Sequence, residues 1–196
     1  MFVIVIEVDF FMKKLFVIVL CSIFFGSLNL FSQDDDTFDR FQLDTVQVQY
    51  LPEGYEREFN TSFETTWNTV VKAIEELNCQ ILQKNYNQTD EGYYKGKIFS
   101  DYCVIVGNTD STWDVLKKYS VKIPIIRGGV WISGRIQYKF WLTEQPNGKT
   151  LVKLKGQISG MEEHVTAKVH FWDSNGILEH RILNILQNAL ESTGTN

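Results

Sequence analysis

Apolar residues near the C-terminus recur at steps of three and four, which is the spacing of one face of an amphipathic helix. This pattern predicts a helix over residues 176–190, after the polar break Asp173-Ser174-Asn175. The apolar stripe consists of Leu178, Ile182, Ile185, Leu186 and Ala189. Such a stripe needs a covering surface, and the segments just upstream have the pattern to supply one.

Apolar and polar residues alternate in three longer segments, 131–143, 149–159 and 164–172. A period of two is typical of strands in an antiparallel sheet that has one covered face. In the third segment the alternation directs one set of side chains to the core and the other to solvent. The core set is Val165, Ala167, Val169 and Phe171, and the solvent set is His164, Thr166, Lys168 and His170.

A second helix is predicted over 61–77, because Thr61 and Glu64 have the spacing of a capping box. A short strand over 55–59 precedes this helix, and a hairpin over 79–100 follows it. The predicted fold class is therefore α+β. We expect an antiparallel β-sheet packed on a long C-terminal helix, with one N-terminal helix between the first strand and the hairpin.

The beginning of the chain has the pattern of a secretory signal peptide. Lys13 and Lys14 precede an apolar run over 15–31, which ends at the small residue Ser32 before a polar, acidic stretch. Two alternatives remain open. Cys21 could be a lipidation site, or the apolar run could stay as an anchor, because about 17 residues can just span a bilayer.

These patterns give the predicted domain boundaries. Residues 1–32 form the signal peptide, and within it we interpret 1–11 as a gene-model extension ahead of Met12. Residues 33–44 form a flexible acidic linker, and 45–192 form a single helix-grip-like domain. The formal net charge is −5, and three of the negative charges, Asp34, Asp35 and Asp36, lie in the linker. The domain body is close to neutral, which disfavours binding to duplex nucleic acid.

The stretch SFETTWNTVVKAIEELNCQILQ, together with the strand before it and the hairpin after it, carries a family resemblance. It is similar to the repeated helix-grip domains of the lipoprotein subunit of the bacterial outer-membrane protein assembly machine. The element order also resembles the START and polyketide-cyclase superfamily, whose domains enclose a cavity for an apolar ligand. The first resemblance implies an envelope protein as partner, and the second implies an apolar ligand. No functional residue carries over, because neither family has an invariant motif that matches here.

The sequence contains no motif of a catalytic or metal-binding site. His164 and His170 are six residues apart on a predicted strand, about 20 Å, which is too far to share a metal ion. The run Glu162-Glu163-His164 contains residue types that act in acid-base catalysis. It falls at an expected hairpin tip, where charged residues are common. We therefore expect a protein without catalytic activity, cofactor or metal.

Two surfaces and one pair of cysteines are candidate features. The predicted basic face of the sheet consists of Arg135, Lys139, Lys153, Lys155 and Lys168. It would bind an anionic partner, or it would only keep the sheet soluble. The predicted interaction edge or lid, which would otherwise just cover one end of the core, consists of Val121, Ile123, Ile125, Ile126 and Arg127. Cys79 and Cys103 would form a disulfide in an oxidising compartment, or each would be buried singly.

Together these features favour an exported protein of the bacterial periplasm or cell envelope. We expect it to act as a protein-binding or structural helix-grip module, with no transmembrane span after the signal is cleaved. The alternative is a binder or carrier of an apolar small molecule or lipid, held in a cavity between the sheet and the C-terminal helix.

Overall fold

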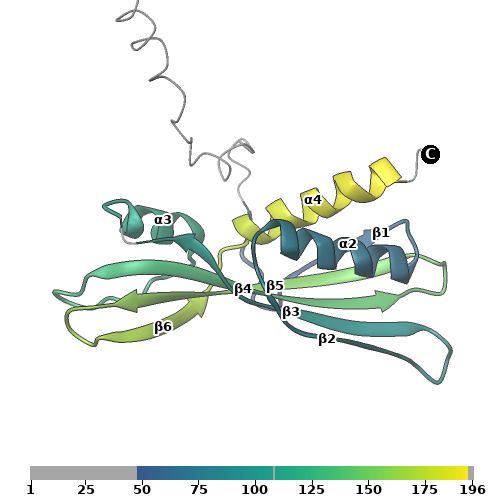
Figure 1. Cartoon of the computed structure of the whole chain (residues 1–196), viewed down its shortest axis with the longest axis horizontal. Coiled ribbons are helices and arrows are strands. Elements are labelled where there is room, and N and C mark those ends of the chain that lie inside the picture. Colours follow the sequence, from purple (N-terminus) through teal and green to yellow (C-terminus); the bar gives the residue numbers. More distant parts are fainter. Residues whose placement is uncertain (1–47, 108, 194–196) are drawn as a thin grey trace, which may run out of the picture. The chain divides into compact units, whose positions relative to one another are not determined.

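The computed structural model describes residues 48–107 and 109–193. The predicted signal peptide, gene-model extension and acidic linker lie outside the described residues. The elements are β1 (Tyr55–Phe59), α2 (Phe63–Glu76), β2 (Ile81–Gln88), β3 (Tyr94–Val106), α3 (Thr112–Tyr119), β4 (Trp131–Glu144), β5 (Thr150–Glu162), β6 (Lys168–Asp173) and α4 (Ile177–Thr193) (Figure 1).

The six strands form one antiparallel sheet in the order β1-β5-β4-β3-β2, with β6 also paired to β5. Strand β4 pairs with β5 along its whole length, so β1 and β6 share the other edge of β5. The pairing with β1 ends at Leu154, and the pairing with β6 begins at Gln157. Two residues of β5, Lys155 and Gly156, therefore lie in a gap between the two short strands.

The helices lie on one side of this sheet, and α2 packs beside α4 (Figure 1). Helix α4 covers the sheet with an apolar stripe that includes Leu178, Ile182 and Leu186, all fully buried. The facing sheet residues include Phe140, Leu142, Val152 and Leu154, which are also fully buried. The predicted α+β fold class is thus confirmed, including a C-terminal helix packed on an antiparallel sheet.

The N-cap of α2 lies one residue later than its pattern predicted. Ser62, not Thr61, is the N-cap, and its hydroxyl accepts a hydrogen bond from the backbone N–H of Thr65 at 3.3 Å. After the helix, Asn78 adopts a left-handed conformation with φ 54°, which reverses the chain toward β2.

The third long segment was assigned to the wrong face. Strand β6 starts only at Lys168, after a turn in which Ala167 has φ 48°. Trp172 takes the buried position, where its indole N–H donates to the hydroxyl of Ser120 at 2.6 Å. Because side chains alternate along a strand, this choice turns Val169 and Phe171 to the opposite, exposed face.

The segment of the predicted interaction edge or lid, residues 121–127, forms no strand. Only the preceding residue, Ser120, makes an isolated bridge to Ser174. Pro124 lacks a backbone N–H, which is consistent with the lack of a ladder here.

Candidate functional site

The face of the sheet opposite the helices, called here the outer face, carries side chains in rows that run across the strands. Residues paired across antiparallel strands project to the same face. One row joins Phe171, Ser159, Arg135 and Val104. The next rows contain Val169, Met161 and Ser133 on one side, and Gln157, Gln137 and Tyr102 on the other. Residues from four strands, β3, β4, β5 and β6, thus share one surface.

These rows surround a hollow of about 470 Å³, called here the outer-face hollow. Its apolar lining consists of Tyr102, Met161, Val169 and Phe171. The ring centroids of Tyr102 and Phe171 are 5.8 Å apart. Phe171 is 53% exposed, and the neighbouring Val104 is 65% exposed. Large apolar side chains gathered at this exposure are typical of a surface that meets another molecule.

The hollow also contains one acid and one base. Asp101 accepts a hydrogen bond from the backbone N–H of Tyr102 at 2.7 Å, which occupies one of its carboxylate oxygens. Burial, and secondarily the nearby Asp101 charge, raise the pKa of Tyr102, so its hydroxyl stays protonated at neutral pH. Arg135 is exposed and forms no ion pair with another described residue. An arginine in this setting is available to a carboxylate from outside the chain.

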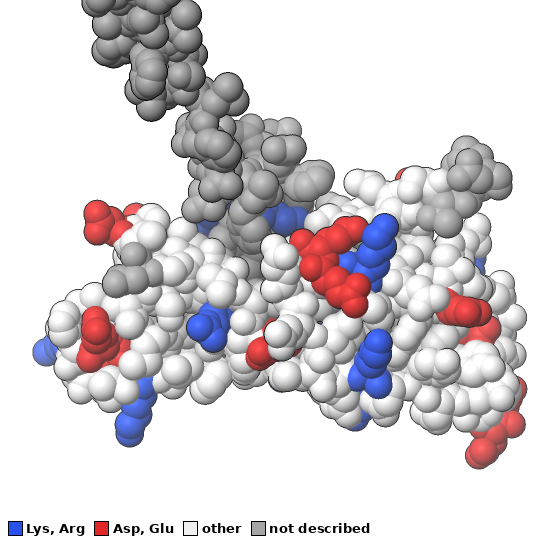
Figure 2. Space-filling model, in the orientation of Figure 1, with Lys and Arg blue, Asp and Glu red and all other residues white. Residues whose placement is uncertain are grey.

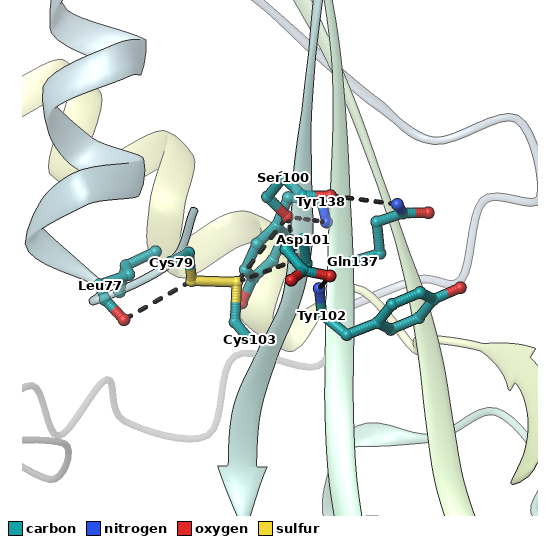
Figure 3. The surroundings of a disulfide bond; sticks show 8 residues. All are labelled: Leu77, Cys79, Ser100, Asp101, Tyr102, Cys103, Gln137 and Tyr138. Carbon is teal, nitrogen blue, oxygen red and sulfur yellow. Dashed lines mark hydrogen bonds between the residues drawn. A yellow bond between two sulfur atoms is a disulfide. The ribbon is translucent and has the colours of Figure 1, made fainter. Parts of the chain in front are cut away.

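A network on the inner side of β3 fixes the strand behind Tyr102. Cys79 and Cys103 form a disulfide, with an S–S distance of 2.05 Å and a Cα–Cα distance of 5.2 Å. The hydroxyl of Ser100 accepts from the backbone N–H of Tyr138 at 2.9 Å. Figure 3 shows the disulfide on one side of β3 and the ring of Tyr102 on the other. The disulfide thus anchors the irregular part of β3 that presents Tyr102 to the hollow.

The structure brings four residues of the predicted basic face together and separates the fifth. Arg135, Lys139, Lys153 and Lys155 project from neighbouring rows of the outer face. Lys168 pairs with Glu162, whose side chain is buried on the other face, so its assignment to the basic face was wrong. The physical reason is the reversed alternation of β6.

Acidic neighbours neutralise much of the remaining basic face. The ammonium of Lys153 lies 3.5 Å from Glu56, and that of Lys155 lies 3.9 Å from Asp173. Lys139 donates to the side chain of Gln157 at 3.2 Å. On the side of the molecule that Figure 2 shows, acidic and basic residues are also interspersed. The lysines therefore support solubility better than they support a broad anion-binding surface.

The predicted edge or lid divides into buried and exposed parts. Ile123 is only 8% exposed and belongs to the core, whereas Ile125 is 85% exposed. Val121 and Arg127 are also exposed, and Ile126 is half-buried. The isoleucines of the segment do not form one continuous apolar edge, because they lie in different environments.

The acid-base cluster near the tip of β5 is used by the turn that follows it. The fully buried carboxylate of Glu162 accepts from the backbone N–H groups of His164, Val165 and Thr166 at 2.6–2.9 Å, and from the Thr166 hydroxyl at 2.7 Å. Burial alone would raise its pKa. The hydrogen bonds outweigh burial and hold the pKa well below the usual range for a carboxyl.

The hydrogen-bonded turn around Glu162 also orients a histidine. The hydroxyl of Thr166 donates to Glu162, so it accepts from the Nε2–H of His170 at 2.7 Å. The ring of His170 lies edge-on to Trp131, with centroids 5.5 Å apart. Within the described residues no three His, Cys, Asp or Glu side chains are placed to hold a metal ion. The arrangement stabilises the β5–β6 turn.

Comparison with protein-family models, with curated proteins and with solved structures finds no match to this chain. Among the helices that the structure describes, none is both long enough and apolar enough to cross a membrane.

Proposed function

We propose that this chain is an exported, non-enzymatic module that binds another protein through the outer-face hollow. The observation that carries the proposal is the group of half-exposed apolar side chains on an uncovered sheet face. Val104, Val169 and Phe171, each at least 50% exposed, gather there around Tyr102. A desolvated apolar centre with a polar rim is the usual anatomy of a protein interface.

The chemistry of the hollow narrows the kind of partner. Its apolar lining suits aliphatic or aromatic side chains, and the exposed Arg135 in its lining suits a carboxylate. We therefore propose a partner segment in which an Asp or Glu is flanked by apolar residues. Because Arg135 forms no ion pair with another described residue, such a carboxylate would gain a bidentate contact without displacing an existing one.

The packing under α4 favours this function over a carrier of an apolar ligand. Tyr138 and Phe140, two of the largest inward side chains of β4, are at most 4% exposed. Leu186 of α4 is fully buried as well. Large side chains from both layers thus occupy the region where a carrier would hold its ligand.

Two features support export to the cell envelope. The stretch after Met12 has the pattern of a signal peptide, and Cys79 is joined to Cys103. Disulfides persist in oxidising compartments such as the bacterial periplasm. The order β1, α2, hairpin, meander and α4 also agrees with helix-grip domains of the envelope, and we include that relation in the proposal.

The test is co-purification of the exported protein from its own envelope, followed by native mass spectrometry. The double variant Val104→Ser and Phe171→Ser removes the apolar contact at exposed positions, so stability should change by less than about 0.5 kcal/mol per site. We expect it to lose at least about tenfold of the bound partner. Ile125→Ser, equally apolar-to-polar but outside the hollow, is the matched control and should retain it. A partner retained equally by all three proteins would contradict the proposal.

A further inference from the structure

A second hollow, of about 440 Å³, lies where the N-terminal end of α2 meets the β2–β3 hairpin. We call it the aromatic groove. Four rings and two carboxylates line it: Phe63, Trp67, Tyr86, Tyr94, Glu64 and Glu144. It lies on the helix side of the sheet, and it shares no lining residue with the outer-face hollow.

The four rings form one connected cluster. Phe63 stacks on Trp67 and on Tyr94, with centroids 5.7 and 5.6 Å apart. Tyr86 meets Trp67 edge-on at 5.0 Å. Phe63 and Trp67 are buried, so they already complete the packing of α2 on the hairpin. Tyr86 and Tyr94 are 55% and 38% exposed and leave ring surface open to the groove.

A glycine holds this arrangement in place. A Cβ atom at Gly96 would lie 2.5 Å from the Trp67 ring and 2.7 Å from the Cβ of Tyr86. Trp67 therefore rests directly on the backbone of β3, beside Tyr86. The rings are positioned before any ligand arrives, which lowers the ordering cost of binding.

The charged residues that line the groove are both acidic. Glu64 lies in the exposed first turn of α2, and Glu144 ends β4. One oxygen of Glu144 accepts from the backbone N–H of Tyr94 at 2.9 Å, which fixes the carboxylate beside the Tyr94 ring. Among the described residues that line the groove, none is Lys or Arg. Electron-rich ring faces, and two carboxylates that form no ion pair with another described residue, are the features of a site for an organic cation.

We propose that the aromatic groove binds an alkylammonium or guanidinium group, held against the rings of Tyr86 and Tyr94 and neutralised by Glu64 and Glu144. The ring faces attract a cation through their quadrupoles. They also release only weakly bound water when a methylated ammonium or a planar guanidinium covers them. A hollow of this volume is within the range of small-ligand sites. Such a cation would come from one of two molecules: a free quaternary ammonium headgroup, or a partner that inserts an arginine side chain.

The test compares charged and neutral probes of equal shape. Choline chloride, its neutral carbon analogue 3,3-dimethylbutan-1-ol, and Nα-acetylargininamide are each titrated into the folded protein. Binding is followed by calorimetry and by the indole N–H resonance of Trp67, assigned with Trp67→Phe. We expect one of the two cations to bind at least about tenfold more tightly than the neutral analogue. Tighter binding of choline assigns a headgroup, and tighter binding of the argininamide assigns a partner side chain.

Two double variants separate charge from shape. Glu64→Gln with Glu144→Gln keeps an acceptor for the N–H of Tyr94 and should weaken the cation about tenfold or more. Tyr86→Leu with Tyr94→Leu keeps apolar bulk, and it should weaken the cation but not the neutral analogue. Glu75→Gln with Glu76→Gln removes the same charge from the exposed face of α2 and should leave the affinity unchanged. The proposal would be overturned by equal binding of the cation and the neutral analogue, or by no binding of either cation. It would also be overturned if both Glu double variants lost the same affinity for the cation.

Discussion

The carboxylate of Glu179 accepts a hydrogen bond from the backbone N–H of Gly156 at 2.9 Å, in the gap that β1 and β6 leave on the edge of β5. Without this contact the N–H would be buried and unpaired. The other carboxylate oxygen of Glu179 accepts a hydrogen bond from the hydroxyl of Ser174 at 2.8 Å. Because Gly156 has no Cβ, the carboxylate can approach, whereas an added Cβ would lie 2.6 Å from its oxygen. The first turn of α4 thus completes the sheet.

Glu179 should make stability depend on pH in a defined direction. Burial raises its pKa, although the hydrogen bonds from Ser174 and Gly156 oppose the shift. Between the unfolded pKa, near 4.5, and the higher folded pKa, the folded state holds more protons, so the free energy of unfolding falls as pH rises. Glu179→Gln keeps an acceptor but does not titrate.

We therefore expect the stability advantage of the wild type over Glu179→Gln to be largest below the unfolded pKa and to shrink as pH rises through that window. Denaturant titrations between about pH 4 and pH 8 measure it. Glu75→Gln, an exposed carboxyl on α2, reports the effect of losing a surface charge. An advantage that grows with pH would mean that the buried carboxylate is stabilised in its charged form.

Gly96→Ala should be costly, because the new Cβ meets the Trp67 ring at 2.5 Å and the backbone oxygen of Asn85 at 3.2 Å. Overpacking of this kind costs about 1–3 kcal/mol. Gly107→Ala is the matched control, since a Cβ there has no heavy atom within 4 Å. Thermal unfolding of the two variants should separate them clearly, and equal melting temperatures would show that Trp67 does not pack directly on β3.

Cys79 and Cys103 should contribute no titratable thiol after denaturation without reductant. Cys79 and Cys103 are 24 residues apart in sequence, and closing a loop of this length stabilises a protein by about 3 kcal/mol. The double variant Cys79→Ser and Cys103→Ser should lose that amount in denaturant titrations. Two free thiols in the exported protein would instead mean that the cysteines are buried singly.

Ile123→Ser and Ile125→Ser should differ, although the two residues are only two positions apart. Ile123 is part of the buried core, so its loss should cost about 2–4 kcal/mol. Ile125 is exposed, and its change should stay within about 0.5 kcal/mol. Similar melting temperatures for both variants would mean that Ile123 does not stabilise the core, and would favour the segment as an interaction edge.

Periodicity alone was enough to place four of the elements. The steps of three and four predicted α2 and α4, and the alternation in 131–143 and 149–159 predicted β4 and β5. These patterns work because each element buries one continuous face. The gap in β5 and its closure by Glu179 could not be read in this way, because they depend on where two other strands end.

The outer-face hollow was missed for a related reason. Phe171 and Trp172 are both large and adjacent, so alternation cannot decide which of them is buried. The hydrogen bond from Trp172 to Ser120, 52 residues away, settles it and exposes Phe171. Tyr102 joins the hollow through a register shift in β3 that no local pattern marks. An exposed aromatic on a strand next to a buried one is the signal that could have indicated this surface.

The most direct test of protein binding at the outer-face hollow is site-specific photocrosslinking in the cell envelope. A photoreactive phenylalanine derivative replaces Phe171 in one protein and Ile125 in another, and adducts are identified by mass. We predict one discrete adduct with a different protein from position 171, its loss when Arg135→Glu is added, and its absence from position 125. No adduct at 171, equal adducts at both positions, or an adduct of twice the chain's own mass would contradict binding of a separate protein at this surface.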